Sequence, residues 1–144
     1  MRGLFPGSFD PFTLGHADIV RRALSLFDEV VIAVGYNENK AGWMPVRDRL
    51  NSIRRLYADE PRVTVESYTG LTVDFAKEHG ITAIIRGVRT TADFEYEMQL
   101  ADVNRQLTGI ETILLPASPQ YASLSSSIVR ELAHFGRDIS AFLP

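Results

Sequence analysis

The chain has 144 residues, of which 45% are hydrophobic and 23% charged, ordinary values for one globular domain. Its net charge of −3 and the lack of any long Lys/Arg run argue against a nucleic-acid-binding surface. The absence of cysteine excludes disulfides, thiolate zinc sites and cysteine nucleophiles. No apolar run approaches a membrane span, and the N-terminus lacks the pattern of a signal peptide. We therefore expect one domain, residues 1–144, in the cytoplasm.

Short apolar runs alternate with helical patterns along the chain. The runs predict strands at residues 4–5, 27–34, 63–65, 82–85 and 112–115. Strands that are apolar almost throughout indicate a parallel sheet covered by helices on both faces. The predicted fold class is α/β, a single Rossmann-like doubly wound domain with a five-stranded parallel sheet, whose ligands should bind beyond the carboxyl ends of the strands.

The intervening segments have the period of amphipathic helices. Helices are predicted over residues 16–27, after Pro45, up to Gly80, over about 91–107 with Thr90 as N-cap, and from the serines at 125–127 to about Gly136. Their apolar positions are Ile19, Val20, Ala23, Leu24 and Phe27, then Val46, Leu50, Ile53 and Tyr57, then Leu71, Phe75 and Ala76, then Phe94, Met98, Ala101 and Leu107, and finally Ile128, Val129 and Leu132.

The loop at residues 7–16 ends in Gly15-His16 where the first helix is expected to begin. Free backbone N–H groups and the helix dipole make such a terminus an anion site, and a histidine there can donate to phosphate oxygens. A plain strand-to-helix turn with an exposed histidine fits these ten residues equally well.

Polar groups follow every predicted strand, at the edge where ligands should bind. They are Ser8 and His16, Lys40, the segment 69–72, the run Arg86-Gly87-Val88-Arg89, and the segment 121–127. Each also has an ordinary explanation: Lys40 could be solvated, the two arginines could be surface charge, and the serines could only cap a helix. Together they bring three cations, a histidine and several hydroxyls to one edge, which favours a phosphate site.

Other polar residues are less informative. Glu95 and Glu97 are two apart and cannot share a helix face, so at most one points inward. His79 and His134 fit the last turns of helices, where the helix dipole favours them, and we assign them no function. The chain has no kinase-type phosphate loop, no dinucleotide fingerprint, no H-E-x-x-H and no G-x-S-x-G.

Two motifs make the chain resemble the nucleotidyltransferase superfamily with the [HT]-x-G-H signature. Residues 13–16 read Thr-Leu-Gly-His, and residues 124–130 read Leu-Ser-Ser-Ser-Ile-Val-Arg, similar to the superfamily's I-S-S-[TS]-x-x-R. Within the superfamily, the stretch Arg86–Gln99, the opening Pro6–Pro11 and the closing Phe142–Pro144 resemble the phosphopantetheine adenylyltransferase family. The resemblance spans essentially the whole chain. Position 8, often Thr in that family, is Ser here, which keeps the hydroxyl.

The resemblance implies adenylyl transfer from ATP to 4′-phosphopantetheine, giving dephospho-coenzyme A and pyrophosphate. The catalytic residues it implies are His16, Lys40 and Arg86. The phosphopantetheine-side residues are Ser8, Lys40, Thr72 and Arg86. The ATP-side residues are Ser8, Phe9, His16, Gly87, Val88, Arg89, Glu97, Tyr121, Ala122, Ser123, Leu124, Ser125, Ser126 and Ser127.

The resemblance also implies a homohexamer and feedback by coenzyme A. We expect Mg²⁺ to arrive with ATP, because no protein-only cluster of carboxylates is found at the edge. Nucleic acid and membrane are not expected partners. Alternatives are another adenylyl- or cytidylyltransferase of the superfamily, against which the stretch Arg86–Gln99 argues, or a catalytically silent nucleotide-binding regulator. A silent regulator would be expected to have lost His16, Lys40 or Arg86, and all three are present.

Overall fold

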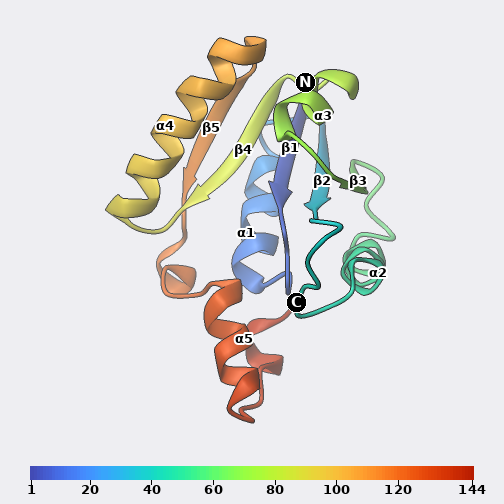
Figure 1. Ribbon diagram of the computed structural model, residues 1–144, viewed down its shortest axis with the longest axis vertical. Coiled ribbons are helices and arrows are strands. Elements are labelled where there is room, and N and C mark those ends of the chain that lie inside the picture. Colours follow the sequence, from blue (N-terminus) through green and yellow to red (C-terminus); the bar gives the residue numbers. More distant parts are fainter.

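The computed structural model describes all 144 residues, which form five strands, five α-helices and two short 3-10 helices (Figure 1). The strands are β1 (Arg2–Gly7), β2 (Glu29–Gly35), β3 (Val63–Tyr68), β4 (Ala83–Val88) and β5 (Glu111–Pro116). The helices are α1 (Leu14–Ala23), α2 (Val46–Leu56), α3 (Thr72–Glu78), α4 (Thr91–Thr108) and α5 (Ser126–His134), with η1 (Pro119–Tyr121) and η2 (Ser140–Phe142). No helix is both long and apolar enough to cross a membrane.

The five strands form one parallel sheet in the order β3-β2-β1-β4-β5. The order reverses direction at β1, which pairs with β2 on one side and with β4 on the other. The predicted α/β class and five-stranded parallel sheet are therefore confirmed. In a doubly wound sheet this reversal is the switch point, where the loops after β1 and β4 diverge and leave a crevice for a ligand.

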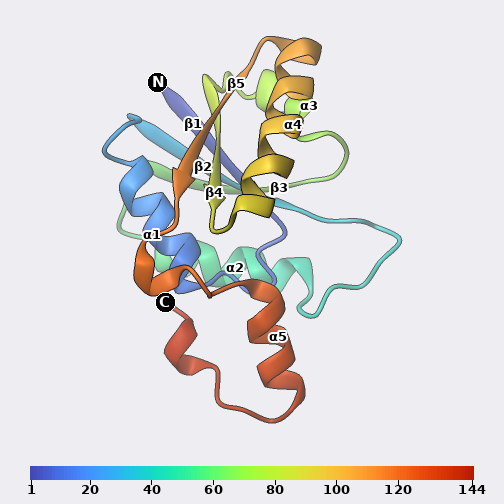
Figure 2. The same cartoon turned by 90° about the vertical axis from the view of Figure 1, so that its left-hand side faces the viewer.

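Alternate residues of the central strands supply two separate cores. Phe5 and Ile32 face the core under α1 and α2, whereas Leu4 and Val31 face the core next to α3. This period of two is what a strand covered on both faces requires. Figure 2 shows α1 and α4 on opposite sides of the sheet, with α5 beyond the carboxyl ends of the strands.

Four helices differ from the sequence expectation. At the start of α3 and in α5 the predicted apolar positions Leu71 and Ile128 are exposed, by 61% and 43%. The first predicted helix ends at Ala23, four residues early, and Phe27 reaches the core from the following turn. In α4 the predicted apolar positions Phe94, Met98 and Leu107 are exposed, by 45%, 51% and 63%. The buried side chain of α4 is Glu97, because the helix turns this carboxylate toward a cation on β4.

Candidate functional site

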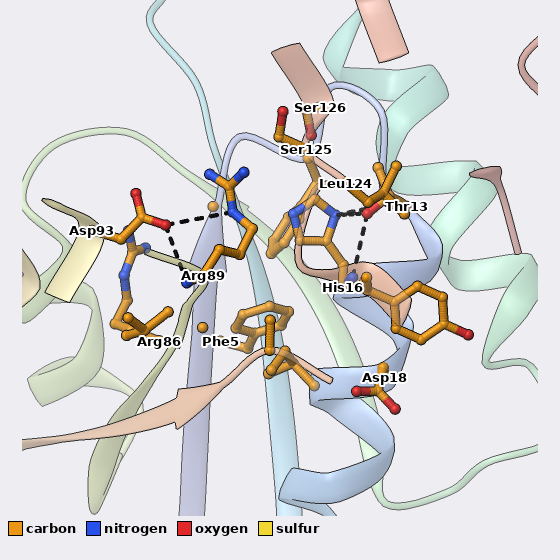
Figure 3. A pocket seen from close by; sticks show the side chains of 18 of the residues that line it. Phe5, Thr13, His16, Asp18, Arg86, Arg89, Asp93, Leu124, Ser125 and Ser126 are labelled. Atoms are coloured by element: carbon orange, nitrogen blue, oxygen red, sulfur yellow. Dashed lines mark hydrogen bonds and ion pairs between the residues drawn. The ribbon is translucent and has the colours of Figure 1, made fainter. Parts of the chain in front are cut away.

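A cavity of about 390 Å³ opens at the carboxyl ends of β1 and β4, closed on its far side by the start of α5 (Figure 3). It lies at the switch point where the fold predicts ligand binding. Most of the predicted site residues line it, namely Ser8, Phe9, His16, Arg86, Gly87, Val88, Arg89, Glu97, Tyr121, Leu124, Ser125, Ser126 and Ser127.

His16 is held in one tautomer by the start of α1. Thr13 caps the helix, and its backbone N–H donates to Nδ1 of His16 at 2.9 Å. Because an N–H group can only donate, Nδ1 carries no proton, and the neutral ring carries its proton on Nε2. His16 thus takes the place that Glu or Gln has in a capping box. Figure 3 shows the other ring nitrogen facing Arg89.

The surroundings of His16 keep its ring neutral. The ring of Phe9 packs edge-on against it with centroids 5.0 Å apart, and that of Phe12 lies at 5.3 Å. Burial lowers the pKa of His16 from 6.5 to about 4, and the positive charges of Arg89 and Arg86 act in the same direction. At neutral pH the residue is therefore an uncharged hydrogen-bond donor in a cavity that Arg86 and Arg89 also line.

Arg86, at the end of β4, is fixed by a bidentate pair with Glu97 of α4. Its Nε and Nη2 donate to the two carboxylate oxygens at 2.8 Å each, and its Nη1 donates to the carbonyl of Pro6 at 3.1 Å. These contacts use three of the five guanidinium N–H groups, so one on Nη1 and one on Nη2 remain. Burial disfavours the charged guanidinium, yet the Glu97 carboxylate outweighs it and raises the pKa of Arg86.

Of the two glutamates of which at most one was expected to point inward, Glu97 is the buried one and Glu95 is exposed. The sequence assigned Glu97 to ATP, and the structure shows it bound to Arg86, a residue assigned to the other substrate. Arg89 lies on the same edge, and its Nε is 3.6 Å from Asp93. Its backbone N–H also donates to Asp93, at 3.1 Å.

The three serines at the start of α5 have three different partners. Ser125 is the N-cap and accepts from the N–H of Ile128. Ser126 donates to the carbonyl of Pro11 at 2.8 Å, and Ser127 accepts from Arg130 at 3.2 Å. The serines therefore do more than cap a helix, because Ser126 fastens the start of α5 to the loop after β1.

Four predicted site residues lie elsewhere. Lys40 is exposed in the loop after β2 and does not line the cavity, contrary to the expectation that it shares one pocket with Ser8, His16 and Arg86. No packing holds this side chain against the rest of the site. Ala122 and Ser123 are also exposed and outside the cavity.

The fourth, Thr72, lines a second cavity of about 220 Å³ between α3 and α4. This second cavity shares Pro6, Arg86 and Glu97 with the first, so the Arg86–Glu97 pair forms the wall common to both. Its other lining is mostly apolar and comes from Leu71, Val73, Ile84, Leu100, Ala101, Val103 and Leu107, together with Asn104 and Thr112.

Sequence reasoning gave no role to two charged residues that line the first cavity, the buried Asp18 and the partly buried Arg130. Asp18 accepts from Ser118 at 2.6 Å and from Arg21 at 2.8 Å; burial raises its pKa, but these hydrogen bonds outweigh burial and hold the pKa below its usual range. Arg130 donates to the carbonyl of Asp10 at 2.9 Å. The spacing of Arg130 three residues after Ser127 on a helix was the available signal.

The residues of the cavity do not form a metal site. No group of three or more His, Asp or Glu side chains gathers anywhere in the chain. The three carboxylates that line the cavity, those of Asp18, Asp93 and Glu97, are each paired with an arginine. The donor set suits phosphate oxygens, which need N–H groups and cations, and any divalent cation would have to be held by the ligand's own phosphates.

The chain is similar to known proteins over almost its whole length. Residues 4–132 match the cytidylyltransferase-like family. The phosphopantetheine adenylyltransferase of Phocaeicola vulgatus is 55% identical over 143 residues, covering 99% of this chain and 95% of its own. Those of Bacteroides fragilis and Streptomyces coelicolor are 54% and 48% identical, each over 99% of this chain and over 95% and 90% of their own.

A solved structure shares the fold at much lower identity. The lipopolysaccharide core biosynthesis protein from Thermoplasma volcanium aligns with a TM-score of 0.58 and 23% identity, covering 82% of this chain and 96% of its own. At that identity the likeness supports the arrangement of the sheet and its helices, and nothing about the chemistry.

Proposed function

Since the chain belongs to the cytidylyltransferase-like family and, within it, to the phosphopantetheine adenylyltransferases, nucleotidyltransferases of coenzyme A biosynthesis, we propose that it transfers the adenylyl group of ATP to 4′-phosphopantetheine. The two cavities would bind the two substrates. The observation that carries this proposal is the placement of Arg86. Arg86, with its two remaining N–H groups, lies on the wall between a polar cavity and a mostly apolar one. The first suits a nucleoside triphosphate, and the second suits the pantetheine arm.

The reaction needs little covalent help from the protein. The attacking phosphate has a second pKa near 6, so at pH 7 it is mostly a dianion and needs no general base. The barrier lies in bringing two anions together and in stabilising charge around the α-phosphorus of ATP. Fixed donors and cations lower such a barrier because they need no reorganisation during the reaction.

On the ATP side, His16 donates from Nε2 to the phosphoryl group being transferred. A neutral donor fits there, because Arg86 and Arg89 already supply positive charge and oppose protonation of the ring. Arg89 and the serine segment 125–127 hold the departing β- and γ-phosphates at the start of α5, where the backbone N–H groups and helix dipole also favour anions.

On the phosphopantetheine side, Arg86 binds the attacking phosphate with its two remaining N–H groups. Ser8 lines the same cavity, and Thr72 lines the second cavity beside the arm. Lys40 reaches the phosphate from its exposed loop once substrate binds. Glu97 orients Arg86, so its contribution to the site passes through the guanidinium that binds the attacking phosphate.

Mg²⁺ would be held by the phosphates of ATP and would neutralise part of their charge. The paired state of Asp18, Asp93 and Glu97 supports this, since none is left free to ligate. We also propose that residues 1–144 act as one domain, in the cytoplasm, and that the chain assembles as a homohexamer with feedback by coenzyme A. The exposed apolar residues of α4, among them Met98 and Leu107, support assembly.

The proposal is tested by supplying the protein with ATP, Mg²⁺ and 4′-phosphopantetheine and measuring pyrophosphate release together with the mass of dephospho-coenzyme A. CTP in place of ATP, and NMN in place of phosphopantetheine, separate the proposal from related transferases. Pantetheine without its phosphate should not react, because it lacks the nucleophile. Pyrophosphate release with CTP or NMN, and none with ATP and phosphopantetheine, would overturn the proposal.

A further inference from the structure

Two buried charges outside both cavities connect the loops of the site. Asp10, in the loop between β1 and α1, is 7% exposed, and Arg49, on α2, is 5% exposed. The Nε of Arg49 lies 3.8 Å from the Asp10 carboxylate. A buried ion pair by itself adds little stability compared with apolar side chains of the same size. The role of the Asp10–Arg49 pair therefore follows from the other groups that the two side chains bind.

The pair binds backbone groups of two separate site loops. The Asp10 carboxylate accepts from the N–H groups of Trp43 and Met44, at 2.8 Å each. Arg49 donates from Nε to the carbonyl of Met44 at 3.0 Å and from Nη1 to the carbonyl of Ser8 at 2.8 Å. Through these four hydrogen bonds, the segment after Lys40 and the backbone of Ser8 are fastened to one another.

The contact with the segment is close enough to exclude a side chain. A Cβ added at Gly42 would lie 2.7 Å from an Asp10 carboxylate oxygen and 2.8 Å from Nη2 of Arg49. Gly42 is thus the residue at which the chain passes directly over the pair, two positions after Lys40.

The other end of this loop is fastened to the sheet. The N–H of Tyr36 donates to the carbonyl of Tyr68 at 3.1 Å, in continuation of the β2–β3 pairing. Between the two fastened ends, the N–H of Lys40 donates to the carbonyl of Asn37 at 3.1 Å in an exposed turn. The chain between Lys40 and Trp43 can span only about 10 Å, so the anchor limits where the ammonium group can go.

We propose that Asp10 and Arg49 are positioning residues for adenylyl transfer. They hold the segment that carries Lys40 and the backbone of Ser8 in one fixed relation, so that both side chains reach the same substrate phosphate. The inference rests on the proposed function, because it assigns Lys40 and Ser8 to the phosphate of phosphopantetheine.

The test uses Asp10→Asn, which removes the carboxylate, and Gly42→Ala, which pushes the segment off the pair from the exposed loop. Asp48→Asn, next to Arg49 on the exposed face of α2, is the matched control for charge loss. Both test variants should raise the KM for phosphopantetheine about 10-fold, since a charge-assisted contact from Lys40 is misplaced. The Kd for ATP measured alone should change less than about 2-fold, and Asp48→Asn should match the unmodified protein.

A double-mutant cycle with Lys40→Met separates positioning from general loss of structure. If the anchor acts on this substrate through Lys40, Gly42→Ala should add less than about a 2-fold change in KM to Lys40→Met. If the KM change in the double variant equalled the product of the changes in Gly42→Ala and Lys40→Met, the Asp10–Arg49 pair would not act through Lys40, and the inference would be overturned. Because Gly42 lies in an exposed loop, this cycle decides the question even where Asp10→Asn impairs folding.

Trp43 is the single tryptophan of the chain and reports on the anchor without any reaction. Acrylamide should quench the fluorescence of Trp43 more strongly in Gly42→Ala, and the quenching should remain unchanged in Asp48→Asn. Unchanged quenching together with an unchanged KM in Gly42→Ala would overturn the inference. Pyrophosphate release by the unmodified protein is the separate check on the proposed function; if none occurs, the proposed function fails and the inference falls with it.

Discussion

Arg86, in β4, and Lys40, in the loop after β2, are both cations assigned to the same substrate phosphate, yet their surroundings are opposite. Arg86 is held by two bonds to Glu97 and one to Pro6, on the wall between the two cavities. Lys40 lies in an exposed turn, outside both cavities. We propose that Arg86 is in place before substrate arrives, whereas Lys40 is brought to the substrate by its loop.

The difference follows from what each backbone can bind. Arg86 lies in β4 directly after three buried residues, where an unpaired charge would be costly, and a carboxylate from α4 accompanies it. Lys40 follows a turn of polar residues in solvent and needs no partner. In the proposed phosphate site, Arg86 would therefore be a fixed cation, and the exposed Lys40 would leave the site open for substrate entry.

The largest effect should come from the fixed part of the site. His16→Ala should lower kcat about 10²–10³-fold, because a preorganised donor to the transition state is lost. The Kd for ATP should change little, since the contact strengthens as charge develops. Steady-state kinetics and calorimetry measure the two quantities. Loss of ATP binding with a normal kcat at saturation would make His16 a binding residue only.

The same substitution at the two cations should separate their structural roles. Arg86→Met should lower the free energy of unfolding by about 2–3 kcal/mol, because it leaves the buried carboxylate of Glu97 without a partner. Lys40→Met should change it by less than about 0.5 kcal/mol. Urea unfolding followed by circular dichroism measures both. Equal losses would contradict the distinction between a fixed and a delivered cation.

The two substrates should separate Lys40 from Arg89. Lys40→Ala should raise the KM for phosphopantetheine about 10-fold, since it removes a charge-assisted contact, with little effect on the Kd for ATP. Arg89→Ala should do the reverse. The measurements are full substrate dependences for both variants. If each variant weakened both substrates equally, a shared phosphate clamp would replace the proposed division.

The smallest effect concerns pH. The imidazole of His16 should show no titration between pH 5 and 8, because burial lowers its pKa to about 4, whereas in urea it should titrate near its ordinary 6.5. Between these two pKa values the unfolded chain binds a proton on His16 that the folded chain does not bind. The free energy of unfolding should therefore decrease as pH falls from about 7 toward 4. Histidine NMR, assigned with His16→Gln, measures the titration. A midpoint near 6.5 in the folded protein would contradict the neutral donor.

Sequence patterns predicted the sheet because β-branched apolar runs such as Val30–Val34 can be covered only on both faces. The rule that ligands bind beyond the strand ends then placed Ser8, His16 and Arg86 at one edge, where the structure also has them. Periodicity could not tell which face of α4 packs against the sheet, because the pair between Arg86 of β4 and Glu97 turns a charged residue of α4 inward. The exposure of Phe94 follows from this orientation of the helix.

The anchor was harder to predict. Arg49 stands among Val46, Leu50 and Ile53 on one face of α2, so a charge at an apolar position was the available signal. What it binds are backbone groups of loops distant in sequence, and no local pattern reports those. The placement of Lys40 was missed for the opposite reason, since an exposed turn has no packing from which to infer a position.

The central claim is that the phosphate of phosphopantetheine attacks the α-phosphorus of ATP. Phosphopantetheine labelled with ¹⁸O in its non-bridging phosphate oxygens tests this most directly. The account predicts that ³¹P NMR and mass spectrometry will find all of the label in dephospho-coenzyme A, one labelled oxygen bridging the two phosphorus atoms, and unlabelled pyrophosphate. Label in the pyrophosphate, or an unlabelled bridge, would contradict it.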